Sequence, residues 1–322
     1  MKYVFIDTCE YIKLFRSSKQ DVERIKKFSE SMKKMDATFI CTEQVKNEYI
    51  KNRSHAIREI SDKSRIELRD ELPLLLGNQD EKSQYKELIK DLKELLSNTN
   101  RKLDTKAKQN NLGADKIIKQ IFKNSEFIKI DDNIVQRAHA RFLRGFPPRK
   151  NKKDNLIGDA INWEALKTKA DLFDDLIIIS SDGDFASYIN PSEAHEILQN
   201  EWESAYGEKL LLYKSLTSFL KEEAEEYFIT LDSDRKEAVD LFVNSPAFAF
   251  THAAIVNLTA FSHFDESDIS AIVYALKENS QISWISDDVD VKRFYKNFYN
   301  NNSESMSNKH IAILKDFYSF VE

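Results

Sequence analysis

One stretch constrains the fold more than any other: a run of four large apolar residues, Leu176 to Ile179, followed closely by two acids. The run is rich in β-branched residues and too short to cross a membrane, which is typical of a strand buried on both faces of a parallel sheet. Asp182 and Asp184 follow its carboxyl end, where ligands bind in open α/β sheets. Because Asp-Gly-Asp is also a common turn, this stretch alone leaves a purely structural role open.

Other short apolar runs also lead to acids. Lys2 to Ile6 predicts a strand that ends at Asp7, and a helical pattern follows directly. Ala37 to Cys41 predicts a second strand, after which Thr42 is suited to cap a helix. Glu48 then lies at the edge of the buried face of that helix. Strand, acid and helix therefore recur in the same order.

Asp159 stands in a different setting. Around it, Ile157, Ala160, Ile161 and Leu166 recur at helical spacing, so Asp159 lies near the start of a buried helix. A buried carboxylate is costly unless it meets a cation. We therefore expect Asp159 to have a positively charged partner.

The alternation of short strands with helices predicts an α/β fold with a parallel sheet and helices on both faces. Residues from about 51 to 125 are long, charged and helical without a sustained heptad, which indicates an inserted helical arm. From about Thr230 onward only helical patterns occur. We therefore expect a first domain over residues 1–228 and a small helical domain over residues 229–322. Asp287, Asp288 and Asp290 fall at a helix start in this second domain, where N-capping explains them without a metal.

The net charge of −6 conceals an asymmetry. Residues 1–153 carry 35 Lys and Arg against 23 Asp and Glu, whereas residues 154–322 carry 13 against 31. A basic arm could clamp a phosphate backbone, although a solvated helical hairpin is an equal alternative. The densest basic loop carries the candidate nucleic-acid-binding residues Arg144, Phe146, Arg149, Lys150, Lys152 and Lys153. Phe146 is the aromatic residue of this loop that could stack on a base.

The composition, with 32% charged and 41% hydrophobic residues, is that of a soluble globular chain. No stretch is apolar for long enough to span a membrane, and Asp7 stands where a signal peptide would still be apolar. We therefore expect a cytoplasmic protein without a membrane partner. Cys9 and Cys41 have no metal-binding spacing and are expected to be reduced, buried thiols. The six histidines show no metal-ligand spacing either.

The predicted strand ends would bring the acids to one edge of the sheet. Asp7, Glu48, Asp159, Asp182 and Asp184 could not all remain ionised there without divalent cations. Oxygen ligands without His or Cys favour Mg²⁺ or Mn²⁺ over zinc. Such ions polarise a phosphate and activate water, which is the chemistry of a metal-dependent phosphodiesterase.

These motifs resemble a known family. Val4 to Thr8, Glu48, Gly158 to Ala160 and Ile179 to Phe185 are similar to the motifs of PIN-domain ribonucleases. The long insertion is most similar to the larger bacterial PIN-like proteins described by a domain of unknown function. The resemblance covers about residues 1–225.

The resemblance implies a PIN-like (Rossmannoid) core and an endoribonuclease. It also implies that Asp7, Glu48, Asp159 and Asp182 bind the metal, with Asp184 auxiliary, and that Thr8 and Ser180 support them. Compact PIN toxins lack the arm and the tail, so their substrates do not transfer to this chain.

Three functions are therefore open. The first is a metal-dependent endonuclease acting on RNA, with DNA as an alternative. Its role could be that of a toxin or an anti-phage effector, and its helical tail could bind a regulator or a second copy. The second is an inactive PIN-like module that binds nucleic acid or protein. A haloacid-type phosphatase also has an acid after its first strand, but it requires Asp-x-Asp, and this chain has Asp7, Thr8 and Cys9.

Overall fold

The computed structural model describes residues 2–63, 79–149, 157–172 and 175–321. The chain divides into two compact units. The first comprises Met1–Val22 and Asp36–Phe219, and the second comprises Glu23–Met35 and Leu220–Glu322. The second unit therefore contains a helical segment from the N-terminal part of the sequence as well as the helical tail.

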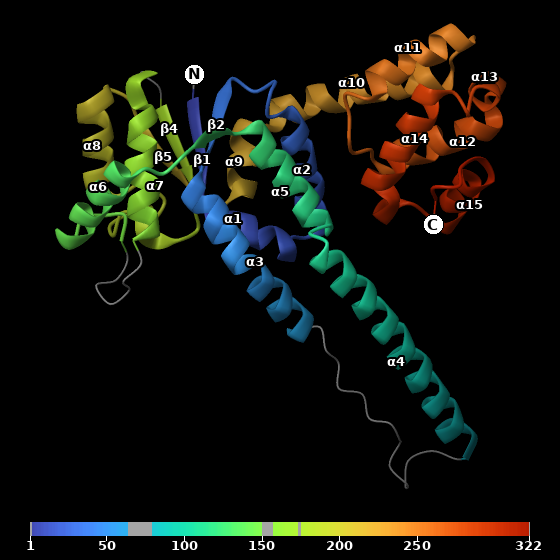
Figure 1. Ribbon diagram of the computed structural model, residues 1–322, viewed down its shortest axis with the longest axis horizontal. Coiled ribbons are helices and arrows are strands. Elements are labelled where there is room, and N and C mark those ends of the chain that lie inside the picture. Colours follow the sequence, from blue (N-terminus) through green and yellow to red (C-terminus); the bar gives the residue numbers. More distant parts are fainter. Residues whose placement is uncertain (1, 64–78, 150–156, 173–174, 322) are drawn as a thin grey trace. The chain divides into compact units, whose positions relative to one another are not determined.

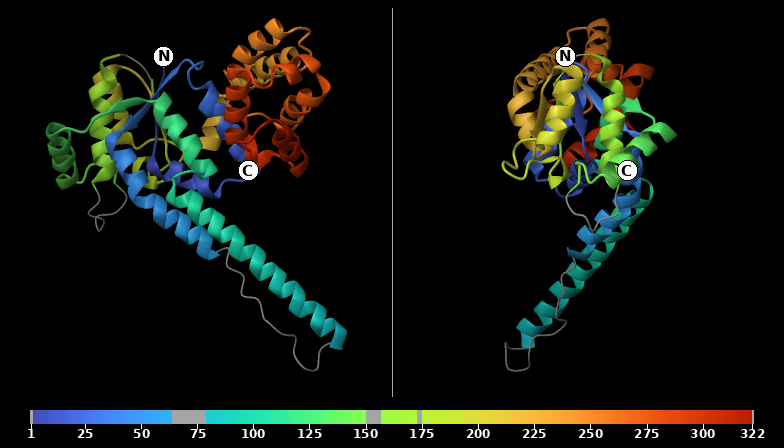
Figure 2. Two further views of the ribbon diagram at one scale, coloured as in Figure 1. Left: turned by 45° about the vertical axis from the view of Figure 1, so that its right-hand side comes forward. Right: turned by 90° about the vertical axis from the view of Figure 1, so that its left-hand side faces the viewer.

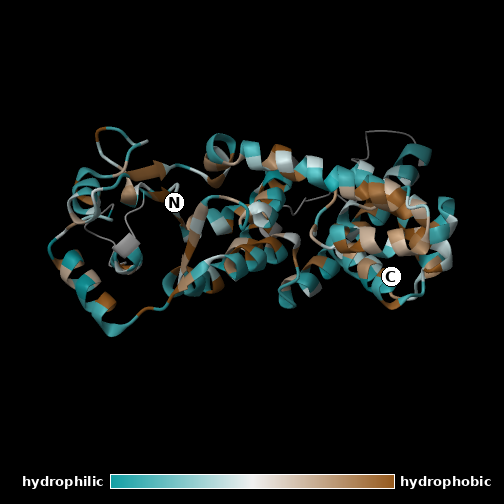
Figure 3. Cartoon of the chain, turned by 90° about the horizontal axis from the view of Figure 1, so that it is seen from above, coloured by the Kyte–Doolittle hydropathy of each residue, from teal (hydrophilic) through white to brown (hydrophobic). Residues whose placement is uncertain are grey.

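The first unit is built on a five-stranded sheet in which every pair of neighbouring strands is parallel (Figure 1). The order is β3-β2-β1-β4-β5, with strands β1 Lys2–Ile6, β2 Ala37–Thr42, β3 Glu126–Ile128, β4 Asp175–Ile179 and β5 Leu210–Tyr213. Helices flank this sheet, so the predicted α/β fold with a parallel, PIN-like core is confirmed. Figure 3 shows the strands as hydrophobic segments among largely hydrophilic helices.

The central strands have the burial that their sequences predict. Leu176 to Ile179 in β4 are all fully buried, as expected for a parallel strand covered on both faces. Lys2 of β1 aligns with Ala37 on one side and with Asp175 on the other. Because this alignment is maintained along the strands, β1 and β4 end at the same level.

The order of the strands makes the chain connections diverge at that level. From β1 the chain proceeds to β2 on one side, and from β4 it proceeds to β5 on the other. In open α/β sheets, ligands bind outside the carboxyl ends of strands where the connections diverge in this way. The divergence lies between β1 and β4, so the residues that follow these two strands occupy the expected position of a site.

Helices form most of the connections in the first unit. They are α1 Thr8–Lys13, η1 Leu14–Arg16, α3 Glu43–Lys63, α4 Gln79–Lys108, α5 Gly113–Asn124, α6 Asp132–Leu143, α7 Gly158–Leu166, η2 Lys167–Leu172, η3 Gly183–Phe185 and α8 Glu196–Tyr206. Two further helices, α2 Lys19–Ser31 and α9 Leu216–Glu223, cross the division between the units. Trp163 and Trp202 are buried core residues with ring centroids 6.0 Å apart.

The long helices α3 and α4 project from the sheet as an arm (Figure 2). At its base Arg53 donates two hydrogen bonds of 2.6 Å to the buried carboxylate of Asp115. The Tyr49 hydroxyl and the Leu112 amide donate to the same carboxylate at 2.9 and 3.0 Å. This cluster ties α3 to the start of α5.

The second unit is helical. Besides the segment Glu23–Met35, it contains α10 Glu225–Val243, α11 Phe248–Leu258, α12 Glu266–Glu278, α13 Ser280–Trp284, α14 Val289–Asn302, η4 Ser303–Ser305 and α15 Asn308–Phe317. Helices α10 to α15 share one apolar core. Within the described ranges of the chain, no helix is both long enough and apolar enough to cross a membrane.

A buried carboxylate links α2 to the helical tail. Glu30 accepts hydrogen bonds from the backbone amides of Ser262 and His263 at 2.7 and 2.6 Å. Burial raises the pKa of Glu30 to about 7, although these bonds and the charges of Arg235 and Lys26 act in the opposite direction.

This raised pKa makes the stability of the second unit depend on pH. Between about pH 4.5 and 7 the folded chain keeps a proton on Glu30 that the unfolded chain releases, so stability falls as pH rises through this window. Glu30→Gln removes the titration, and we expect the variant to gain on the order of 1 kcal/mol relative to wild type between pH 5 and pH 8. Thermal unfolding of both proteins across this range tests the prediction, and parallel pH profiles would contradict it.

Candidate active site

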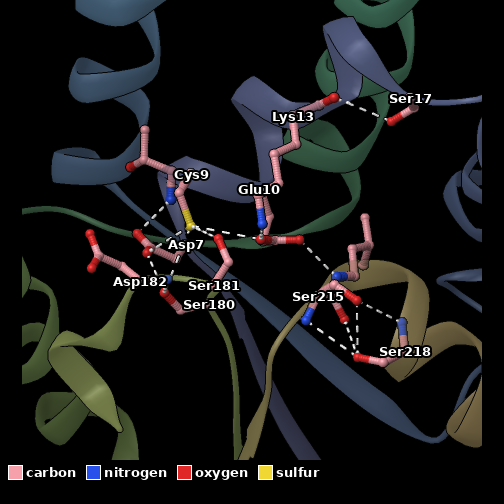
Figure 4. A network of polar contacts seen from close by, with 12 residues as sticks. Asp7, Cys9, Glu10, Lys13, Ser17, Ser180, Ser181, Asp182, Ser215 and Ser218 are labelled. Carbon is pink, nitrogen blue, oxygen red and sulfur yellow. Dashed lines mark hydrogen bonds and ion pairs between the residues drawn. The ribbon is translucent and has the colours of Figure 1, made fainter. Parts of the chain in front are cut away.

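Asp7 lies at the centre of the site, directly after β1. Its amide donates to the carbonyl of Ile179 at 2.9 Å, which fixes it beside the end of β4. The side chain is only 4% exposed, and it accepts hydrogen bonds of 2.6 Å from the Thr8 amide and from the Ser180 hydroxyl. Figure 4 shows Asp7 among Cys9, Ser180 and Ser181. Burial, with a smaller contribution from the charge of Glu48, raises the pKa of Asp7 to about 6.

Helix α3 brings Glu48 to the same place. Thr42 caps this helix by accepting from the Val45 amide at 3.1 Å, as its sequence predicts. One Glu48 oxygen accepts a hydrogen bond from the Thr8 hydroxyl at 2.8 Å. The other accepts from the side-chain amide of Gln44 at 2.6 Å. Neutral donors thus orient the Glu48 carboxylate without neutralising it.

Asp159 is the residue most affected by the other acids. Burial raises the pKa of Asp159 well above its usual range, and the charge of Asp7 raises it further. A hydrogen bond with Asp184, and the charges of Asp184 and Glu48, act in the same direction. Asp159 is therefore in hydrogen-bond contact with Asp184, and Asp7 and Glu48 are near enough for their charges to act on it.

Asp182 contacts the site in a different way. Its amide donates to the Ser180 hydroxyl at 3.1 Å, and its carboxylate accepts from the Gly183 amide at 2.7 Å to cap η3. Asp184 forms a hydrogen bond with Asp159, and its charge raises the pKa of Asp159. Asp184 is therefore a direct neighbour of Asp159.

Glu10 is a buried acid next to the site that the sequence did not indicate. One of its oxygens accepts from the Leu216 amide at the start of α9 at 2.8 Å, and the other pairs with Lys13 at 2.7 Å (Figure 4). In the sequence, Glu10 and Lys13 look like an ordinary surface pair at i and i+3. Only the approach of α9, about 200 residues later, buries Glu10.

The chemistry of the clustered acids fits a hard divalent cation. The donor set consists of carboxylate oxygens, and two of the carboxyl groups have raised pKa values that a bound cation would lower. Among the residues with described positions, however, no three His, Cys, Asp or Glu side chains already form the ligand group of one ion.

The basic loop begins beside the acids. The Arg149 amide donates to the carbonyl of Asp184 at 3.2 Å, and its guanidinium lies 4.4 Å from the Phe142 ring centroid. Arg144 caps the end of α6 and is exposed, and Phe146 is 40% exposed. The predicted nucleic-acid-binding residues Lys150, Lys152 and Lys153 lie outside the described residues.

The comparison with protein families agrees with this geometry. The family model described as a PIN domain matches residues 4–185, more than half of the chain. The chain therefore belongs to the PIN-domain family, which confirms the resemblance seen in its motifs. No curated protein and no solved structure matches it.

Membership gives the site a functional context. PIN domains are generally nucleases, which typically use divalent metal ions and bind nucleic acid. The assignment to the larger bacterial PIN-like proteins stays a prediction.

Proposed function

We propose that this chain is a metal-dependent endoribonuclease that hydrolyses phosphodiester bonds. The observation that carries the proposal is the gathering of acids at the ends of β1 and β4: the Asp7 amide is bonded to the Ile179 carbonyl, a Glu48 oxygen lies against Gly158, and Asp159 is hydrogen-bonded with Asp184. Acids that repel one another at the carboxyl edge of a parallel sheet are costly to keep, and a divalent cation would offset that cost. The membership in a nuclease family supports the same conclusion.

Asp7, Glu48 and Asp159 would hold the ion, which we propose to be Mg²⁺ or Mn²⁺, with Asp184 auxiliary. Asp182 is also proposed as a ligand, since its carboxylate accepts from the following amide as that of Asp7 does. When bound, such an ion polarises a phosphate and activates a water molecule. Thr8 and Ser180 keep the carboxylates of Glu48 and Asp7 oriented through their hydroxyl groups.

One observation favours a second function. Among the described residues, no three His, Cys, Asp or Glu side chains are already arranged to hold one metal ion. An inactive PIN-like binding module would show the same arrangement. Incubation with labelled single-stranded RNA, tRNA and DNA, in Mn²⁺, Mg²⁺ or EDTA, separates the two functions. The proposed nuclease cuts RNA only with metal, whereas binding without cutting in any metal would favour the binding module. Cutting of DNA alone would support the nuclease function and reject RNA as the substrate.

We also propose a role as a toxin or anti-phage effector. The helical unit would then bind a regulator or a second copy of the chain.

Gly158 provides a test of how closely the site is packed. A Cβ atom on Gly158 would lie 2.2 Å from a carboxylate oxygen of Glu48 and 3.1 Å from the Gln44 amide nitrogen. Gly158→Ala must therefore displace Glu48, and we expect cleavage to slow by about 10- to 100-fold, as displacements of about 1 Å do in other enzymes. Initial rates on labelled RNA measure the effect.

Gly207→Ala is the matched control. This glycine ends α8 with a φ of 73°, and a Cβ there meets nothing within 4 Å. The control should lose about 1 kcal/mol of stability through backbone strain and keep its cleavage rate. A Gly158→Ala protein with the wild-type rate would refute the proposed role of Glu48.

A further inference from the structure

The loop between η3 and α8 exposes two large apolar side chains next to the site. Tyr188 is 74% exposed and Ile189 is 89% exposed. They follow Phe185, which is fully buried, and Asp184, whose carboxyl group lies beside Asp159. Exposed apolar residues are common, but an exposed aromatic ring beside a site also offers a π face to a ligand.

The loop itself is held firmly by hydrogen bonds. The Ser187 hydroxyl donates to Glu196 at 2.5 Å and accepts from the Ile189 amide at 3.0 Å. The Ser187 amide donates to the Glu193 carbonyl at 2.9 Å, and Asn190 donates to the Glu193 carboxylate at 2.8 Å. Ala186 and Ala194 close the loop as an antiparallel bridge. The exposure of Tyr188 is therefore built into the fold of the loop.

The ring of Tyr188 is connected to the acids through the start of the basic loop. Its hydroxyl donates to the Arg149 carbonyl at 3.5 Å, and the Arg149 amide in turn donates to the Asp184 carbonyl at 3.2 Å. The ring also packs edge-on against His195, with centroids 5.6 Å apart and planes at 80°. Despite these two contacts, 74% of Tyr188 remains exposed.

We propose that Tyr188 stacks on an unpaired base of a single-stranded nucleic acid whose phosphate reaches the acidic site. The inference rests on the proposed nuclease function and narrows its substrate to unpaired nucleotides. Every base has a π face, so stacking of this kind is tolerant of sequence and contributes about 1–3 kcal/mol per base. A duplex, whose bases are already stacked and paired, gains nothing from the ring.

Fluorescence of a single-stranded RNA that carries 2-aminopurine tests the proposal. All proteins carry Asp7→Asn and are measured in Mn²⁺, so that binding is observed without cutting. We expect Tyr188→Ala to weaken binding by about 5- to 100-fold and to abolish the quenching that stacking causes. Tyr188→Phe should keep the binding affinity and the quenching within about twofold of the parent protein, because its aromatic ring is retained.

Ile189→Ala is the matched control, because it removes a neighbouring exposed side chain without a π face. It should bind within about twofold of the parent protein and quench equally. Equal losses on single-stranded RNA and on a duplex, unchanged binding in Tyr188→Ala, or no binding of single strands by the parent protein would each overturn the proposal. Cleavage by the wild-type protein is measured separately, so failure of the nuclease function is distinguished from failure of the stacking.

Discussion

Replacing Asp159 with Asn is expected to abolish cleavage while making the metal-free protein more stable. Asp159 is half-buried near Asp7, Asp184 and Glu48, so its ionised form is unfavourable whenever no cation is bound. The amide has nearly the same shape and no charge. We expect the cleavage rate to fall by about 1,000-fold, equivalent to about 4 kcal/mol of transition-state stabilisation.

At pH 8 in EDTA the same substitution should raise the stability of the protein by about 1–2 kcal/mol, because residues selected for function often oppose stability. Thermal unfolding and initial rates measure the two effects on one preparation. Asp287→Asn, at an aspartate that is 88% exposed in the helical unit, is the control and should change neither. Undiminished cleavage, or a less stable Asp159→Asn protein, would remove Asp159 from the site.

Replacing Asp115 with Ala is expected to destabilise the first unit more than any exposed substitution. The change leaves the guanidinium of Arg53 buried without its counter-ion, and it leaves the Tyr49 hydroxyl and the Leu112 amide without their acceptor. Breaking a buried ion pair from one side typically costs about 3–5 kcal/mol. Urea unfolding measures this loss.

A second substitution identifies its cause. Arg53→Met together with Asp115→Ala should recover part of the stability, since no uncompensated charge remains. Asp104→Ala, at an exposed position of α4, should stay within about 0.5 kcal/mol of wild type. A loss below about 1 kcal/mol in Asp115→Ala would show that the arm does not depend on this cluster.

The sheet could be predicted because its signals are local. The apolar run of β4 indicates the strand, and the acids that follow β1 and β4 mark where each strand ends. Both signals lie within a few residues of one another. The helix start at Asp159 is equally local, and its burial follows from the apolar residues around it. These features made the parallel sheet and the PIN-domain family accessible from sequence.

Features that depend on distant segments were not accessible. Ile25 and Phe28 of α2 are buried, and hydrophobic periodicity carries no information on the unit to which they belong. Glu10 is buried by α9, and the exposure of Tyr188 results from a loop whose bonds link Ser187 to Glu193 and Glu196. Asp182 and Asp184 are two residues apart and look alike in the sequence. In the structure, Asp182 caps η3 and Asp184 forms a hydrogen bond with Asp159, and this difference follows from the geometry of the turn.

The most direct test of the central claim is the rate of cleavage of labelled single-stranded RNA as Mn²⁺ is titrated, for wild-type and Asp7→Asn proteins purified in parallel. If Asp7 helps hold the ion, the wild-type rate rises with Mn²⁺, saturates and disappears in EDTA, whereas Asp7→Asn stays at background throughout. Cleavage that persists in EDTA, or that is equal in the two proteins, would contradict a metal-dependent site at the carboxyl ends of β1 and β4.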